Sequence, residues 1–257
     1  MRLSRRVALG GVQLDSLDRR IVVRGVVAGT PAQTVEETDR MGGCGRRITR
    51  EHWDTLETQV VFGMLIPKTD LQGRRELYEK VAAWALKKGW LTVGHMEDRR
   101  MYVDQVILPP AADLWNWTED FTIVFRSVNV PFWRGATAKT ATVGSITSGS
   151  TTISVDSMLK CPLNVTFQNI SGAVCTNFSI SAGGNGLSFP GINLSGSGSL
   201  VISHTNAGLL TVTADGQNAY GKLTGSDDLI VPPGDVKVTV NATRAGKLTI
   251  THYGRSV

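Results

Sequence analysis

The sequence has 257 residues and a formal net charge of +5, from 27 basic and 22 acidic side chains. This mixture argues against a nucleic-acid-binding module, because such modules concentrate Lys and Arg in one run or on one face. No apolar run approaches the roughly 20 residues that a membrane-spanning helix requires, so we expect no membrane partner.

The three cysteines, Cys44, Cys161 and Cys175, form no Cys-x-x-Cys pair, and their odd number argues against a disulfide framework. A bridge between Cys161 and Cys175 stays open beside the favoured reading, which is small buried thiols in a reducing compartment. The N-terminus is basic, but its apolar run at residues 7–11 is too short for a signal peptide. We therefore expect the protein to stay where it is made.

The composition changes near residue 135. Residues 1–135 hold all six tryptophans and 37 of the 49 charged side chains, whereas residues 136–257 hold 12 charged side chains and 31 Ser and Thr. Two differently composed segments of ordinary domain size predict two domains, at residues 1–135 and 136–257.

The first domain begins with a strand-like run at residues 21–27, followed by a Gly- and charge-rich stretch at residues 29–47. We expect that stretch to be a long exposed loop. A short apolar run from Gln59 to Ile66, which ends before Pro67, predicts a second strand.

Residues 69–89 predict an amphipathic helix of about four turns. Thr69 and Gln72 fit a capping box, and Gly89 marks the expected end. An apolar stripe recurs at helical spacing, at Leu77, Val81, Trp84 and Ala85. This stripe favours a core-facing helix, with a partner-binding helix as the alternative.

A hairpin is predicted next, with residues 90–93 pairing with residues 101–107 across a solvated turn. The segment Glu119–Trp133 then alternates Phe121, Ile123 and Phe125 on one face and ends in a Pro-Phe-Trp sequence. One helix set against several strands predicts an α+β domain.

The second half of the chain predicts an antiparallel β-sandwich of the jelly-roll or lectin-like kind. Alternating apolar pairs and triplets indicate its strands: Ile153/Val155, Leu163/Val165/Phe167, Phe178/Ile180, Leu200/Ile202, Leu210/Val212, Leu229/Val231, Val236/Val238/Val240 and Leu248/Ile250. Asp215-Gly216 and Pro233-Gly234 indicate turns between antiparallel strands. The glycines at 183–186 read as turn residues, and Ser195–Ser199 reads as a flexible, linker-like patch.

No catalytic or metal-binding motif emerges. The histidines His52, His95, His204 and His252 lack metal-ligand spacing. Cys44 and His52 could form only half of a zinc site. Asp227 and Asp228 are adjacent just before a strand, so they should point to opposite faces. We expect no enzyme activity, cofactor or metal, and a hydrolase has no identifiable nucleophile.

The order of these elements resembles the distal tail proteins of long-tailed, siphovirus-type bacteriophages. The resemblance is carried by the loop containing Met41–Arg47, the 69–89 helix, the strand that ends in Val130-Pro131-Phe132-Trp133, and the strand-turn-strand segment Asp228–Val238. It covers almost the whole chain, through the order of short motifs.

The resemblance implies a first domain that is a split β-barrel with one helix and forms a six-fold ring at the distal end of the tail. It implies a galectin-like second domain that faces outward. Such a ring joins the tail tube protein to tip, hub or baseplate proteins, with the tape measure protein as a further partner. DNA passes through the channel without specific binding. The expected location is the virion tail tip, after synthesis in the host cytoplasm.

Four large rings, Trp115, Trp117, Phe132 and Trp133, lie within 19 residues and suggest ring-interface residues. The alternative is that they form the core and the seam between domains. A different function, a carbohydrate-binding sandwich of a receptor-binding or surface protein, also stays open. The absence of Trp from residues 136–257 weakens it.

Overall fold

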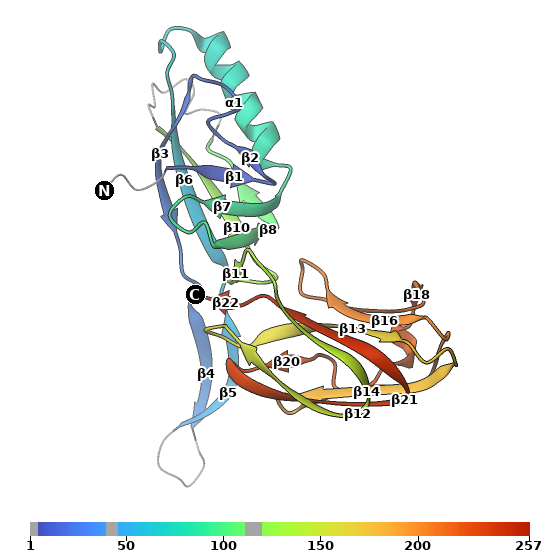
Figure 1. The fold of residues 1–257 in the computed structure, drawn as a ribbon. Coiled ribbons are helices and arrows are strands. Elements are labelled where there is room, and N and C mark those ends of the chain that lie inside the picture. The colour runs from blue at the N-terminus through green and yellow to red at the C-terminus, as the bar shows by residue number, and fades with distance from the viewer. Residues whose placement is uncertain (1–4, 40–45, 111–119) are drawn as a thin grey trace. The chain divides into compact units, whose positions relative to one another are not determined.

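The computed structural model describes residues 5–39, 46–110 and 120–257 (Figure 1). The chain divides into two compact units, Met1–Trp133 with Val257, and Arg134–Ser256. Strands dominate both units, and every strand pair with a described register is antiparallel. The predicted fold class, mainly β with an α+β first domain and an antiparallel sandwich, is confirmed.

The first unit contains two sheets and the helix α1 (Leu71–Ala85). One sheet has the strand order β3 (Ile21–Ala28), β6 (Leu56–Met64), β10 (Asp120–Ser127), β9 (Gln105–Ile107). The other contains, in order, β2 (Val12–Gln13), β1 (Val7–Leu9), β7 (Gly89–Val93), β8 (Arg99–Val103). β11 (Trp133–Gly135) leads into the second unit. The predicted pairing of residues 90–93 with residues 101–107 is right for β7 and β8, whereas β9 pairs with β10 instead.

The core of the first unit forms where β10 meets β6 and α1. Phe121 lies opposite Phe62 in the β10–β6 register, and their rings stack at 5.5 Å between centroids. Trp84 of α1 meets Phe125 edge to face at 5.8 Å. The apolar face of β10 and the predicted helix stripe are all buried. The core-facing reading of the helix is therefore correct.

The helix begins one residue later than the predicted capping box. Asp70 is the N-cap, and its carboxylate accepts a hydrogen bond from the backbone N–H of Gly73 at 2.9 Å. Asp is as good an N-cap as Thr, and the backbone turn from Pro67 to Asp70 places the carboxylate at the helix end. The helix stops at Ala85, before Lys88 and Gly89 adopt left-handed backbone angles of φ 56° and 116°.

The expected loop at residues 29–47 is wrong for residues 33–39 and 46–47, which form strands. Residues 33–39 form β4 (Gln33–Asp39), which pairs with β5 (Arg46–Trp53). The loop motif Met41–Arg47 lies outside the described residues up to position 45. The prediction failed because both faces of this hairpin are exposed, so neither strand carries the apolar alternation that indicates a half-buried strand.

The second unit is a sandwich organised by two long strands, β12 (Lys139–Val155) and β21 (Gly234–His252). The segments at Val236–Val240 and Leu248–Ile250, predicted as separate strands, are halves of β21. The first half pairs with β14 and the second half with β13, while β12 follows β21 along its length. β21 therefore passes from one layer of the sandwich to the other, as corner strands do.

The remaining strands extend the two layers. Beyond the first half of β21 lie β14 (Cys175–Ala182), β15 (Asn185–Leu194) and β19 (Thr224–Gly225). Beyond its second half lie β13 (Cys161–Asn169), β16 (Ser199–His204), β17 (Leu210–Ala214) and β18 (Gln217–Asn218). Short elements complete the unit: the 3-10 helix η2 (Tyr220–Lys222), β20 (Ile230–Val231), which pairs with β13, and β22 (Arg255–Ser256).

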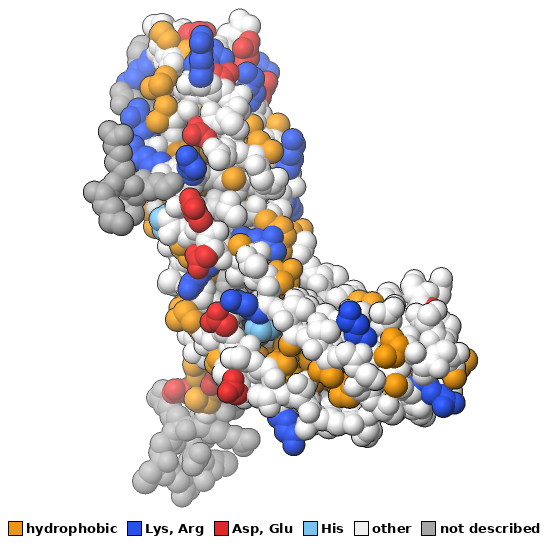
Figure 2. All heavy atoms as spheres, in the orientation of Figure 1, with side chains coloured by type: hydrophobic (Ala, Val, Ile, Leu, Met, Phe, Trp, Pro, Cys, Tyr) orange, Lys and Arg blue, Asp and Glu red, His pale blue; other side chains and the backbone are white. Residues whose placement is uncertain are grey.

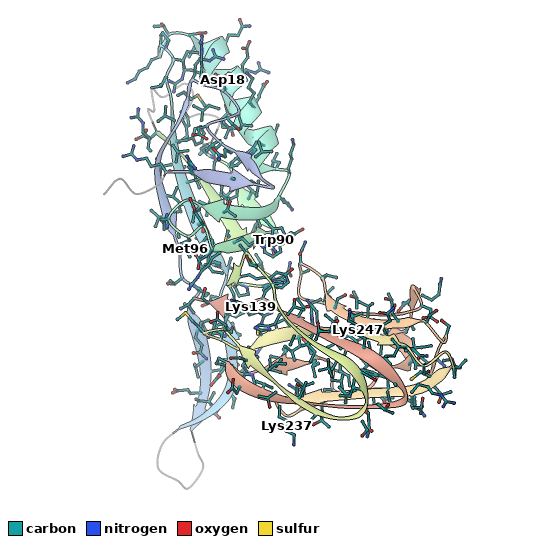
Figure 3. All side chains as sticks on the ribbon, viewed as in Figure 1. Asp18, Trp90, Met96, Lys139, Lys237 and Lys247 are labelled. Carbon is teal, nitrogen blue, oxygen red and sulfur yellow. The ribbon has the colours of Figure 1, made fainter. Side chains whose placement is uncertain are left out.

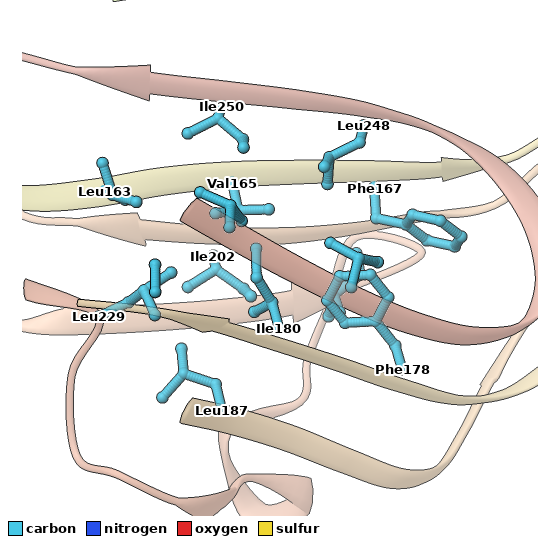
Figure 4. Close-up of a cluster of buried hydrophobic side chains, with 14 of the residues drawn as sticks. Leu163, Val165, Phe167, Phe178, Ile180, Leu187, Ile202, Leu229, Leu248 and Ile250 are labelled. Atoms are coloured by element: carbon cyan, nitrogen blue, oxygen red, sulfur yellow. The ribbon is translucent and has the colours of Figure 1, made fainter. Parts of the chain in front are cut away.

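The sandwich core lies between the two layers (Figure 4). Phe167 of β13 and Phe178 of β14 point toward one another, with ring centroids 4.7 Å apart. Every inward position predicted from the sequence is buried except Leu210, which is half-buried. β15 was not predicted, because its sequence NGLSFPGINL contains Pro and four turn-forming Gly and Asn residues that disguise its alternation.

The predicted turns hold at two of three places. Gly183-Gly184 and Asp215-Gly216 connect hairpins with positive φ angles at both residues, as type I′ turns require. The strands on either side of Pro233-Gly234 do not pair with each other, since β20 pairs with β13 and β21 with other strands.

The segment Ser195–Ser199 is not a flexible linker. The carboxylate of Asp215 accepts hydrogen bonds from the backbone N–H groups of Ser195, at 2.9 Å, and Ser199, at 2.8 Å. The N–H of Gly172 donates to the carbonyl of Gly196 at 3.1 Å. These hydrogen bonds join the 195–199 segment to the turn at Asp215 and to the loop at Gly172.

Cys161 and Cys175 are buried free thiols, and Cys44 lies outside the described residues. Within the described ranges, no helix is long and apolar enough to cross a membrane.

Candidate functional site

The hairpin of β4 and β5 is a largely exposed element of the first unit. Within the described part of the chain its strands pair only with each other, from Gln33 opposite Trp53 to Asp39 opposite Arg46. Apart from half-buried Trp53, its described side chains are all exposed, including the apolar Val35 and Ile48 at 39% and 52%. Both outer edges can therefore accept another strand.

The hairpin continues the sheet of the first unit. The N–H of Gly29 donates to the carbonyl of Glu57 at 2.9 Å, and that of Asp54 donates to the carbonyl of Ala32 at 2.8 Å. These two bonds connect the β3–β6 pair to the β4–β5 pair, and Figure 1 shows the β4–β5 hairpin continuing away from α1. The core of the first unit positions the hairpin, but the described side chains of the outer part of the hairpin are not buried in that core.

The base of the hairpin is anchored by the aromatic residues that end the 119–133 segment. The indole N–H of Trp133 donates to the carbonyl of Gly29 at 3.1 Å, and Phe132 meets Trp53 edge to face at 5.4 Å. Trp133 is 1% exposed and Phe132 is 9% exposed. Their burial in the single chain favours the alternative, that they are core residues, over the ring-interface hypothesis.

The other two rings of that hypothesis, Trp115 and Trp117, lie outside the described residues. Nothing in the structure tests an interface role for them.

The two strands of the hairpin differ in charge. β4 carries the acidic residues Glu36, Glu37 and Asp39, whereas β5 is rich in arginine, at positions 46, 47 and 50. Across the two strands, Glu36 lies within ion-pair distance of Arg50, at 3.9 Å. At the base, Asp54 accepts a hydrogen bond from the hydroxyl of Thr34 at 2.7 Å and faces His52 at 3.6 Å. The β4 edge of the hairpin is thus acidic in sequence, and the β5 edge is basic.

Charge is distributed differently over the two units. Figure 2 shows Lys, Arg, Asp and Glu interspersed over the first unit, whereas the visible face of the sandwich is mostly uncharged. The composition change seen in the sequence therefore corresponds to two surfaces of different chemistry.

The remaining residues considered for chemistry are dispersed. His95, Glu97 and Asp98 are exposed at the β7–β8 turn, as predicted for a solvated tip. Arg100 stacks on Trp90, with its guanidinium carbon 4.3 Å from the ring centroid. No group of three or more His, Cys, Asp or Glu residues that could hold a metal ion occurs within the described ranges.

One polar cluster was missed by the sequence analysis. His204 at the end of β16 lies between Asn164 of β13 and Asp228, with which its Nε2 forms a 2.6 Å hydrogen bond. No sequence signal could have found it, because the three residues are 40 and 24 positions apart. The cluster depends on the order of strands in the sheet.

Comparison with known proteins identifies the fold. No protein-family model and no curated protein sequence matches this chain. Among solved structures, the SPP1 Dit protein superposes with a TM-score of 0.65 and 13% identity, over 98% of this chain and 99% of that one. This chain has the Dit fold. The predicted resemblance to phage distal tail proteins is confirmed at the level of the fold.

The Dit fold includes both units, because the superposition covers nearly the whole of each chain. Chains of the phage p2 baseplate in its activated conformation also align. With Ca the TM-score is 0.44 at 8% identity, covering 92% of this chain and 91% of that chain. With Sr the TM-score is 0.42 at 9% identity, covering 90% of each chain. The fold assignment depends on the Dit structure alone.

Proposed function

We propose that this protein is a structural component of a phage tail that assembles into a ring at its distal end. Support comes from the Dit fold over both units, since the SPP1 Dit protein is described as a paradigm of the hub adsorption apparatus in phages that infect Gram-positive bacteria. Fold alone does not determine function, so the proposal also needs a surface that can build such a ring.

The observation that carries the proposal is the exposed β4–β5 hairpin. A closed ring of identical subunits needs two different, mutually complementary patches on each subunit. The hairpin offers two open strand edges whose sequences carry opposite charges. An acidic edge of one copy and a basic edge of the next are complementary, and unpaired strand edges supply backbone hydrogen bonds.

The finer assignments follow the resemblance. Residues 1–135 form the ring, with six subunits, and residues 136–257 form an outward sandwich. The ring joins the tail tube protein to tip, hub or baseplate proteins, with the tape measure protein as a further neighbour. DNA passes through the channel without specific binding. The protein is made in the host cytoplasm, resides at the virion tail tip and has no enzymatic role.

Mass measurement of the full chain tests this proposal. Light scattering across a concentration series should give a closed multiple of 27.7 kDa. Ile48→Asp on the hairpin should shift the equilibrium toward the monomer. Ile170→Asp is the matched control, because Ile170 is 49% exposed on the sandwich and Ile48 is 52% exposed. A monomer at every concentration, or equal effects of both variants, contradicts ring formation through the hairpin.

A further inference from the structure

The segment Ser226–Val231, here called the core strap, covers the sandwich core with little regular structure. Its residues Leu229 and Val231 are fully buried. Only Ile230 and Val231 form a strand, β20, which pairs with Pro162 and Cys161 of β13. A segment that buries two core residues through so short a strand depends on other bonds for its position.

Side chains supply several of those bonds. The amide of Asn185 donates to the carbonyl of Ile230 at 2.7 Å, and the hydroxyl of Ser226 accepts from the N–H of Gly186 at 3.0 Å. The bond with an ionisable partner is the one between Asp228 and His204. Nε2 of His204 lies 2.6 Å from Oδ1 of Asp228, and the His204 side chain is 4% exposed.

The other ring nitrogen of His204 also faces an oxygen. Nδ1 lies 3.0 Å from Oδ1 of Asn164, and the backbone N–H of His204 donates to the same atom at 3.1 Å. A backbone N–H can only donate, so the Asn164 atom it meets is the amide oxygen and not the amide nitrogen. Nδ1 must therefore carry a proton to bond with it.

Nε2 must carry a proton as well, because Asp228 is ionised. Burial alone would raise the pKa of Asp228, but hydrogen bonds from His204 and from the N–H of Leu229 hold that pKa below its usual value. An ionised carboxylate only accepts hydrogen bonds, and a histidine whose two nitrogens both donate is an imidazolium.

We infer that His204 is a buried imidazolium that joins Asp228 of the core strap to Asn164 of β13, and that loss of its second proton loosens the strap. The neighbours support a charge-dependent contact. Asn164 of β13 and Leu210, opposite His204 on β17, are uncharged. The charged group facing His204 is Asp228 on the strap. Asp228 is in turn attracted by Arg255 of the C-terminal segment.

The direction of the pH effect follows from the two donors. The fastening is intact while His204 holds both protons and Asp228 holds none. Loss of either proton from His204 leaves a ring lone pair facing an oxygen. Lowering the pH weakens the same contact only when Asp228 becomes protonated, and its lowered pKa moves that step to more acid pH than for an ordinary Asp carboxyl. This inference concerns the sandwich alone and does not depend on ring formation.

The protonation state is tested directly by nitrogen-15 NMR of the full chain labelled at histidine, in solution or, for a large assembly, under magic-angle spinning. The His204 signals are assigned by their loss in His204→Gln. Two protonated ring nitrogens at neutral pH are expected. A neutral tautomer, with one unprotonated nitrogen, overturns the inference.

The fastening is tested by hydrogen exchange of the strap peptide, corrected for the intrinsic effect of pH. Asp228→Asn should speed exchange of residues 226–231 roughly tenfold, as loss of a charged hydrogen bond does. Asp215→Asn is the matched control, because Asp215 binds backbone N–H groups elsewhere in the sandwich. Strap protection that is equal in wild type and Asp228→Asn, and unchanged in wild type from pH 6 to pH 9, overturns the inference.

Discussion

The ammonium group of Lys139 lies 3.9 Å from the carboxylate of Asp156, although the whole of β12 separates them. A straight strand of that length would span roughly 50 Å. β12 therefore folds back on itself, so its two ends meet at one end of the sandwich. The turning point coincides with register shifts between Val143, Ile146 and Ser148, opposite Gly246 of β21.

Gly246 is required at that turning point. A Cβ there would collide with the ring of Phe167, which is fully buried and packs on Phe178. We expect Gly246→Ala to destabilise the sandwich by roughly 1–3 kcal/mol, the usual cost of overpacking a core. Urea unfolding measures the loss. Gly144→Ala is the control, since nothing lies within 4 Å of a Cβ at that position. Equal losses in the two variants would argue against the steric explanation.

Asp18 links the approach to β3 with the helix (Figure 3). Its carboxylate accepts hydrogen bonds from the guanidinium of Arg20, at 2.9 Å and 3.0 Å, and from Lys80 of α1 at 2.9 Å. The bonds from Arg20 and Lys80 hold the pKa of Asp18 far below its usual range. A lowered carboxyl pKa stabilises the fold above about pH 3.9, and this stability is lost as the pH falls below that value.

We therefore expect Asp18→Asn to lower the melting temperature at pH 7. The difference from wild type should shrink as the pH falls below about 4, where the unfolded Asp takes up its proton. Thermal unfolding at several pH values measures both effects. Asp98→Asn, at an exposed turn position, should change little. A difference that stays constant down to pH 2 would show that the charge of Asp18 is unimportant.

His252 predicts an acid sensitivity of the sandwich. It is 4% exposed, its Nε2 has no hydrogen-bond partner within the described residues, and burial lowers its pKa. The folded state therefore binds its proton more weakly than the unfolded state. Stability is complete above about pH 6.5, the ordinary histidine value, and is lost as the pH falls below it.

The variant His252→Gln removes this titration. We expect its urea midpoint to change less between pH 7.5 and pH 5 than that of the wild type. His95→Gln is the control, because His95 is exposed at a turn. If the wild type and His252→Gln respond equally to acid, another group causes the pH dependence.

Trp133 predicts a stability effect and not a selective loss of assembly. Its buried indole bonds to Gly29 at the base of the hairpin. Trp133→Ala should cost roughly 3–5 kcal/mol, as large-to-small changes of aromatic core residues do. Trp90→Ala should cost less, because Trp90 is only half-buried. Denaturant unfolding followed by circular dichroism distinguishes these. A Trp133→Ala protein of unchanged stability that fails to associate would restore the interface hypothesis.

The sequence indicated those elements whose side chains face one core. The alternation of Phe121, Ile123 and Phe125 and the helical spacing of Leu77 and Val81 both follow from burial on one side, and both proved correct. Asp215-Gly216 was predictable because its turn type requires positive φ at both positions.

The sequence could not indicate features that depend on what lies across the fold. The β4–β5 hairpin has no buried outer face, so the spacing of Val35 and Ile48 carries no signal. The continuity of β21 depends on β12 accompanying it through the corner. His204 and Asp228 meet only because β16 neighbours β13 in the sheet, and β13 also pairs with β20 at the end of the strap.

The two long strands also determine how the sandwich can fail. Because β12 and β21 each run through both layers, neither layer can peel away without breaking hydrogen bonds in the other. In a sandwich of two separately hydrogen-bonded sheets, the sheets could separate with their own hydrogen bonds intact. Here β12 and β21 link the two layers by continuous strands. We therefore expect a single cooperative unfolding step for this unit. Under mechanical load, it should resist as one body up to a single breaking force.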